Sequence, residues 1–261
     1  MGQQGFVCPL VGRAAMTTAK GELMFWRIIG RLACIVAVSF SQSTAGAARA
    51  NCEDEIELAL AAIGPGPAEE MKSRLISERI TVFDDSLRAH AVAALPASLR
   101  SQRITQGKLL GRVEAIFNQV IRLHGRSGKL VLFLYRNDLP SAILWSGCVV
   151  AVSDGLAEPL YDDELAGVLS HELSHSYFED EMAEGRRAQN AFAMRVIELK
   201  CDGVAILSLK LSGRNPAAYM RGLRRLQLIT KRKGLSDVVF QSHPTLVARM
   251  KFSQRLIESL K

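Results

Sequence analysis

The sequence lacks any apolar run long enough to cross a lipid bilayer. Its longest, Leu32–Phe40, has nine residues, whereas a membrane-spanning helix needs about 20. Internal repeats are also missing, so we expect no repeat domain. A chain of 261 residues without these features is the size of one domain, or of one domain with a helical annex.

The short apolar run is instead typical of an export signal. Arg27 and Arg31 precede it, and small residues follow it up to Ala48-Arg49-Ala50, which has the A-x-A pattern of a signal-peptidase site. We therefore predict a signal peptide and export, to the periplasm. Cleavage after Ala47 and retention of the run as a membrane anchor stay open as alternatives.

A large excess of charge of one sign is also absent once this signal is set aside. The whole chain has a formal charge of +7, but residues 1–50 contain five basic residues and one acidic residue, and the remainder stands at +3. We therefore expect no nucleic-acid partner. Basic residues do gather in Arg221–Lys233, where a solvated face on a core-packing helix is the favoured interpretation and peripheral contact with a membrane of anionic lipid is the alternative.

Cysteine is sparse too. Beyond residue 50 the chain has only Cys52, Cys148 and Cys201. In an oxidising compartment one pair could form a disulfide, and all three pairings stay open. Cys201 lies between Lys200 and Asp202 on the helix that is expected to supply a metal ligand, but its direction on that helix favours a small packing residue over a ligand.

What the sequence does contain is His171-Glu172-Leu173-Ser174-His175, an H-E-x-x-H pattern. Two histidines four residues apart lie on one face of a helix, so both rings can reach one metal ion. Glu172 could take a proton from a metal-bound water, whose pKa zinc lowers to about 7. The pattern therefore predicts a zinc hydrolase, although it is short enough to need support from its surroundings.

The surroundings favour a helix over Asp162–Phe178. This stretch opens with three acidic residues, which suit an N-cap and the positive end of the helix dipole. Its apolar residues have helical spacing: Leu165, Val168, Leu169, Leu173 and Phe178.

A third metal ligand is expected from the next helical run, Gln189–Leu211, after a turn marked by Gly185. Glu198 and Asp202 lie four residues apart in this run, which is otherwise rich in apolar residues. Buried carboxylates are costly unless they are paired or bind metal. We therefore predict Glu198 as the third ligand and Asp202 as the partner of a ligand histidine, which fixes its tautomer.

These segments together resemble a known family. H-E-x-x-H, Glu-x-x-x-Asp on the next helix, and His243-Pro244 with Arg249 six residues after the histidine are similar to the gluzincin metallopeptidases that include HtpX proteases, CAAX prenyl proteases and BepA-like proteases. The resemblance extends upstream through Asp163–Ser170 and covers about Lys129–Met250.

The resemblance implies roles for individual residues. Zinc would bind His171, His175 and Glu198, and Glu172 would be the general base and later proton donor. His243 would stabilise the oxyanion, and Arg249 would pair with a carboxylate near the site. The edge strand near the metal would receive the substrate backbone as an added strand. Ser141-Ala142-Ile143 departs from the family's Asn-Ala-Phe, which leaves the contacts with substrate open.

We accordingly predict an α+β fold, helix-dominated, with a small β-sheet beside the active-site helix. The expected organisation is a signal peptide (1–50, with an overlong N-terminal extension at 1–23 before Met24), a helical N-terminal region (51–125) and a zinc metallopeptidase domain (126–261). The spacing of apolar residues predicts three helices in the N-terminal region, at Glu53–Ile63, at Ala68–Ile80 and along the stripe Leu109–Ile121, and two buried strands after it, at Lys129–Tyr135 and Gly147–Ser153. The expected function is zinc-dependent hydrolysis of peptide bonds in unfolded or misassembled envelope proteins, as in protein quality control. The alternative is a noncatalytic, zinc-stabilised periplasmic chaperone or assembly factor for outer-membrane proteins.

Overall fold

The computed structural model describes residues 45–63, 70, 84–234 and 243–260, and of residues 45–51 only the backbone. The predicted signal run Leu32–Phe40 and nearly all of a helix expected at Ala68–Ile80 lie outside these residues. The helices of the described part include none that is both long and apolar enough to span a membrane.

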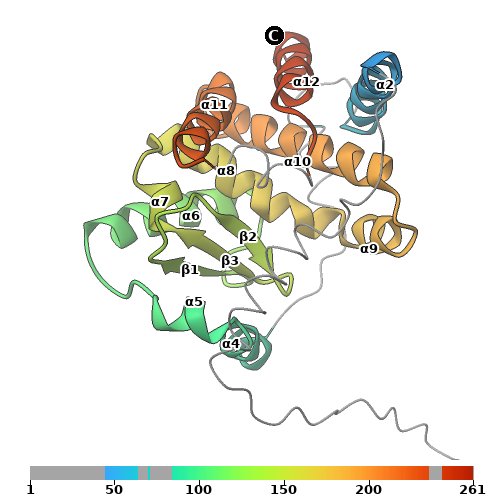
Figure 1. Cartoon of the computed structure of the whole chain (residues 1–261). Helices are drawn as coiled ribbons and strands as arrows, with labels where there is room; N and C mark the ends of the chain where they lie inside the picture. The colour runs from blue at the N-terminus through green and yellow to red at the C-terminus, as the bar shows by residue number, and fades with distance from the viewer. Residues whose placement is uncertain (1–44, 64–69, 71–83, 235–242, 261) are drawn as a thin grey trace, which may run out of the picture. The chain divides into compact units, whose positions relative to one another are not determined.

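A three-stranded sheet forms one layer of the molecule (Figure 1). It consists of β1 (Val131–Tyr135), β2 (Ala142–Trp145) and β3 (Val149–Ser153), in the order β1-β3-β2. β1 is parallel to β3, and β2 is antiparallel to it. The β2–β3 hairpin turns at Ser146 and Gly147, whose φ angles of 48° and 68° suit a tight turn between twisted strands.

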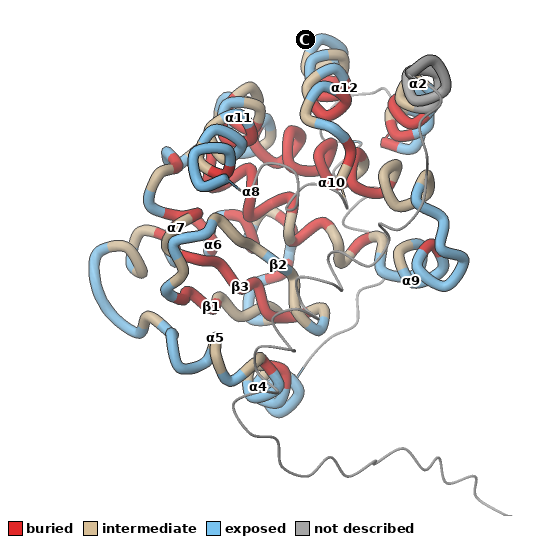
Figure 2. The backbone as a smooth tube through the Cα atoms, viewed as in Figure 1, coloured by how far each residue is buried: buried red, intermediate tan, exposed pale blue. Residues whose placement is uncertain are grey.

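Both faces of the sheet are covered, which explains why β3 is buried along its whole length and is apolar up to its last residue, Ser153. Leu134, Val150 and Val152 join the main core. On the other face, Phe133 and Ala151 lie in a smaller cluster with residues of α4 (Asp85–Ala93), which precedes α5 (Ala97–Ser101). Figure 2 shows the buried residues of β1 and β3 between these layers.

The helix α6 (Lys108–Leu123) matches a helix predicted from its apolar stripe. The stripe is half-buried at Leu109 and buried from there on, at Val113, Ile116, Phe117, Val120 and Ile121. It packs against β1, against α7 (Asp154–Ala157) and against α8 (Asp162–Ser174), and so holds α8 beside the sheet.

The predicted helix Asp162–Phe178 is shorter in the structure. α8 ends at Ser174, and a 3₁₀ turn, η1 (His175–Tyr177), follows. The N-cap is Tyr161 and not Asp162, and the Glu164 carboxylate accepts a hydrogen bond from the Tyr161 N–H at 3.1 Å. The three acidic residues thus occupy the first turn of the helix, after the N-cap, where their negative charge stabilises the helix start as expected.

The turn predicted at Gly185 is wrong. Gly185 lies inside α9 (Glu179–Arg187), where a Cβ atom would stand 3.0 Å from the Met194 sulfur. The chain reverses instead near Gln189, whose φ is 51°. Asn190 then caps α10 (Ala191–Leu211) by accepting a hydrogen bond from Ala193 N–H at 3.0 Å. A side chain at this position would press on Met194, so the glycine eases the packing of α9 on α10.

α10 runs through the middle of the helical layer (Figure 1). It packs against α8, α2 (Ala45–Ile63) and α12 (Leu246–Ser259), while α11 (Ala217–Arg232) lies against α8 and α12. Ile56 of α2 and Phe252 of α12 share one core with Leu165 of α8 and Leu199 of α10. The predicted regions 51–125 and 126–261 thus bury side chains together. The prediction of a helix-dominated α+β fold with a small sheet beside α8 is confirmed.

Candidate active site

The end of α8 brings His171 and His175 together one turn apart. Their ring centroids are 5.1 Å from each other, with the rings nearly perpendicular. One ligand atom from each histidine and one from Glu172 all lie within 4.8 Å of one another. His171 is buried, whereas His175 and Glu172 are partly accessible. The H-E-x-x-H pattern therefore forms a compact group of two imidazoles and one carboxylate.

Glu198 reaches the same group from α10. Its Oε2 atom lies 3.4 Å from Nε2 of His171 and 2.6 Å from Nδ1 of His243. Neither approach has the angles of a hydrogen bond, and this oxygen is buried without a hydrogen-bond partner. Two carboxylates, Glu172 and Glu198, thus stand near the histidine pair as candidates for a third ligand.

The electrostatics of this group favour a bound cation. Burial lowers the pKa of His171, but the neighbouring carboxylates of Asp202 and Glu198 outweigh this effect and raise that pKa to about 9. Burial likewise raises the pKa of Glu198, and the nearby charges of His243 and His171 bring it well below its usual value. The pair therefore favours a positive charge between Nε2 of His171 and Oε2 of Glu198. Two imidazoles and a carboxylate are a donor set that zinc accepts.

Asp202 lies behind His171 and is fully buried. Its Oδ1 is 2.9 Å from Nδ1 of His171, on the side of the ring that faces away from Glu198. Arg249 of α12 donates to both carboxylate oxygens, at 2.8 Å from Nε and 2.5 Å from Nη2. Burial raises the pKa of Asp202, but Arg249 and His171 lower it to about 2. The predicted partners Asp202 and Arg249 are therefore brought together at His171.

Tyr219 of α11 belongs to the same cluster, and the sequence analysis missed it. It is buried, and its hydroxyl lies 2.9 Å from Nδ1 of His171 and 2.6 Å from Oδ1 of Asp202. A tyrosine on an amphipathic helix has no sequence signal that separates this position from an ordinary core residue.

Cys201 was interpreted only as a packing residue, and that reading is incomplete. The residue is fully buried, but its sulfur lies 3.4 Å from Nδ1 of His175. Adjacent residues of α10 therefore contact the two histidines, Cys201 at His175 and Asp202 at His171. Among the described residues Cys52, Cys148 and Cys201 are all free, so no disulfide pairing is present.

His243 stands at the start of the last segment, just before α12. Its side chain is 30% exposed, and its closest charged neighbour is Glu198. Pro244 behind it is buried, and Thr245 caps α12 by accepting a hydrogen bond from Ala248 N–H at 3.2 Å. His243 is thus held at the accessible side of the site.

His124 is the C-cap of α6, a position where a positive charge would be favourable, but its surroundings keep it neutral. The side chain is buried, with Nδ1 2.8 Å from the Tyr177 hydroxyl and Nε2 2.8 Å from Oγ of Ser208. Burial, together with the charge of Arg126, lowers the pKa of His124 to about 4. The imidazole is therefore neutral at physiological pH.

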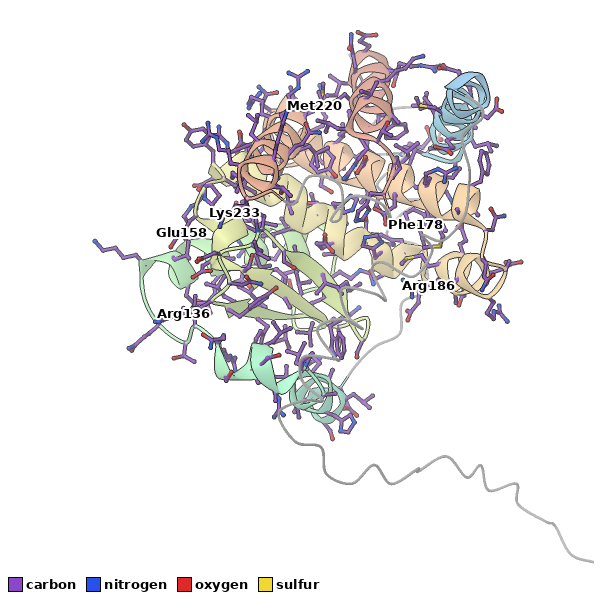
Figure 3. All side chains as sticks on the ribbon, viewed as in Figure 1. Arg136, Glu158, Phe178, Arg186, Met220 and Lys233 are labelled. Carbon is purple, nitrogen blue, oxygen red and sulfur yellow. The ribbon has the colours of Figure 1, made fainter. Side chains whose placement is uncertain are left out.

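The basic segment Arg221–Lys233 forms the later part of α11 and its C-cap, and Figure 3 labels Met220 and Lys233 at the two ends of this segment. Arg225 pairs with Glu164 at 2.9 Å, and Lys233 donates to the Asp138 carbonyl at 2.5 Å. Four further basic residues are exposed and have no ion pair among the described residues: Arg221, Arg224, Lys231 and Arg232. This arrangement is compatible with a solvated face and with lipid contact.

Comparison with known families supports the metallopeptidase interpretation. Residues 108–194 match the model of Peptidase family M48. The matched segment contains α6, the sheet, α8 and α9, and hence His171, Glu172 and His175, but it ends before Glu198. A search of curated proteins found no match. The narrower assignment to HtpX, CAAX or BepA-like proteases stays a prediction.

Proposed function

We propose that this protein is an exported zinc-dependent endopeptidase that hydrolyses peptide bonds of unfolded or misassembled envelope proteins, as in quality control of the periplasm. The M48 match supports a metallopeptidase acting on polypeptides. The observation that carries the proposal is the buried Oε2 of Glu198, which faces the His171 ring and has no hydrogen-bond partner. A carboxylate oxygen in such a position costs free energy unless a cation is bound there.

In this proposal His171, His175 and Glu198 hold one zinc ion. Zinc, when bound, supplies a Lewis acid and lowers the pKa of a water to about 7. Glu172 is partly accessible, unlike its buried neighbours His171 and Leu173 on α8, so its carboxylate can meet substrate and water. It takes the proton from the attacking water and later gives it to the leaving amine. His243, on the open side, donates a hydrogen bond to the oxyanion of the substrate.

The outer strand β2 supports a polypeptide substrate. It lies at the edge of the sheet and packs against α8, and Ile143 on it is 44% exposed. An extended peptide can add to such an edge through backbone hydrogen bonds, which depend little on side chains. This mode suits unfolded chains of varied sequence.

The alternative function is a noncatalytic chaperone or assembly factor that needs zinc only for stability. It would use the same β2 edge to hold unfolded outer-membrane proteins. The two proposals differ in the need for Glu172, because proton transfer requires this carboxylate and metal binding through Glu198 does not.

Glu172→Gln therefore tests the proposal, with Glu184→Gln on the exposed face of α9 as the matched control. Zinc content would be measured by elemental analysis and hydrolysis with casein. We expect one zinc per chain in the wild type and in both variants. The control Glu184→Gln should hydrolyse casein as the wild type does, and Glu172→Gln should not hydrolyse it. Loss of zinc in Glu172→Gln would make that residue a ligand. If Glu172→Gln lost hydrolysis yet fully rescued a deletion strain, the protein would act as the noncatalytic factor.

A further inference from the structure

The hydroxyl group of Tyr219 lies at the centre of the buried polar cluster behind the histidine pair. Arg249 Nη2 donates to it at 2.6 Å, and it donates to Oδ1 of Asp202 at 2.6 Å. Nδ1 of His171 lies 2.9 Å from the same hydroxyl oxygen. The hydroxyl thus joins the cation, the carboxylate and the imidazole of the cluster.

The backbone of α8 is shaped to admit this tyrosine. Gly167 lies four residues before His171, on the same face of the helix. A Cβ atom at Gly167 would stand 2.9 Å from Cδ2 of Tyr219, closer than real Cβ contacts come. On α11, a Cβ at Gly222 would lie 3.3 Å from Cβ of Glu164. Two glycines at the crossing of α8 and α11 let the helices approach closely enough for the hydroxyl to reach His171.

The hydrogen-bond directions restrict the protonation of His171. Oδ1 of Asp202 already accepts from Tyr219 and Arg249, and this buried carboxylate also faces Nδ1 of His171. A ring nitrogen between a carboxylate and a hydroxyl that already donates elsewhere is held as N–H. In the neutral ring that metal binding requires, the lone pair is then on Nε2, on the side of Glu198.

We infer that Tyr219 is a positioning residue of the metal site, whose hydroxyl fixes the Asp202 carboxylate and through it the tautomer of His171. This inference rests on the zinc site of the proposed function. Tyr219 touches neither the metal nor the substrate. It acts on zinc affinity through Asp202, in the way that outer hydrogen-bond partners orient ligand histidines.

The test is Tyr219→Phe, which keeps the ring against Gly167 and removes only the hydroxyl. Zinc affinity would be measured by competition with a chelator, and folding by the unfolding temperature of the metal-free protein. We expect zinc binding to weaken by roughly 10- to 100-fold. Tyr161→Phe is the matched control, because Tyr161 is 68% exposed at the other end of α8 and should leave zinc affinity unchanged.

A double-mutant cycle with Asp202→Asn measures whether Tyr219 and Asp202 are coupled in their effect on zinc affinity. Such coupling would not arise if Tyr219 only stabilised the fold. If Tyr219 acts through Asp202, the loss in the double variant should be clearly smaller than the product of the two single losses. The absorption spectrum of the cobalt(II)-substituted protein should also change in Tyr219→Phe and not in Tyr161→Phe. Independent, multiplicative losses would overturn the inference.

Gly167→Ala keeps the test decisive if Tyr219→Phe does not fold. The added methyl group displaces the Tyr219 ring without removing its hydroxyl, so zinc affinity should fall in the folded variant. Unchanged affinity in the variant that folds would overturn the inference, while zinc binding and casein hydrolysis by the wild-type protein would still support the proposed function. A wild-type protein that binds no zinc would overturn both.

Discussion

Two histidines of this protein, His171 and His124, are alike in burial and in having a tyrosine partner, but their other neighbours carry opposite charge. His171 and His124 are both buried, and each has a tyrosine hydroxyl within 3 Å of Nδ1, at 2.9 Å and 2.8 Å respectively. The other neighbours of His171 are the carboxylates of Asp202 and Glu198, whereas those of His124 are the Ser208 hydroxyl and the Arg126 charge.

The pKa values show what this difference does. Carboxylates raise the pKa of His171 to about 9 in spite of burial, and burial with a neighbouring cation lowers that of His124 to about 4. Burial and hydrogen bonding alone therefore do not make a histidine a metal ligand. The site needs negative charge near the imidazole, and of these two histidine clusters the one between α8 and α10 has it.

The largest expected effect separates the two clusters by metal content. Glu198→Gln removes the carboxylate that faces His171 and should leave almost no zinc after dialysis, since neutral Gln is a poor replacement for a charged ligand. His124→Gln alters the other buried histidine and should retain one zinc per chain. Elemental analysis of both variants decides, and full zinc retention by Glu198→Gln would show that Glu198 is not the third ligand.

In the cluster around His171, His243→Phe tests whether His243 takes part in hydrolysis or in zinc binding. His243 lies 2.6 Å from Glu198 but is partly exposed, so we expect zinc to stay bound and the rate of peptide hydrolysis to fall by roughly 10²–10³, as for loss of one oxyanion donor. The measurement is kcat at saturating peptide with zinc content determined in parallel. A variant that loses zinc together with activity would assign His243 to metal binding.

The buried neutral His124 should make the free energy of unfolding depend on pH. The pKa of His124 is about 4 when folded and has its ordinary value of 6.5 when unfolded. The unfolded chain binds the proton more readily between these values, so stability is fully present above pH 6.5 and declines as the pH falls to 4. A difference of this size corresponds to at most about 3 kcal/mol.

Urea unfolding of the metal-free protein between pH 4 and 7.5 measures this contribution. His124→Gln should be less stable at pH 7 but should lose less stability on acidification. Equal slopes in the wild type and the variant would mean that His124 does not remain neutral in the folded protein.

The smallest expected effect concerns the exposed basic face of α11. If this face is only solvated, Arg224→Gln should bind vesicles of anionic lipid as the wild type does, and so should the control Arg186→Gln on α9. Contact with lipid would instead cost about 1 kcal/mol per removed charge near the surface, or about fivefold in binding. Co-sedimentation with anionic and neutral vesicles distinguishes these outcomes.

Much of this protein could be predicted from local sequence patterns. The apolar stripe of α6, the strands β1 and β3, and the position of His171 and His175 on one helix face all depend on the repeat of the helix or strand. The placement of Glu198 and Asp202 in an apolar run indicated that both would be buried. Such features need only the residues near them in the chain.

Other features were decided only by the tertiary structure, because they depend on how helices cross and rotate against one another. Tyr219 reaches His171 because Gly167 and Gly222 let α8 and α11 approach closely, and Cys201 meets His175 because of the register of α10 on α8. His124 is neutral because partners far along the chain bury it. Periodicity identifies which face of a helix is buried, but it does not specify which side chain of another helix will lie opposite.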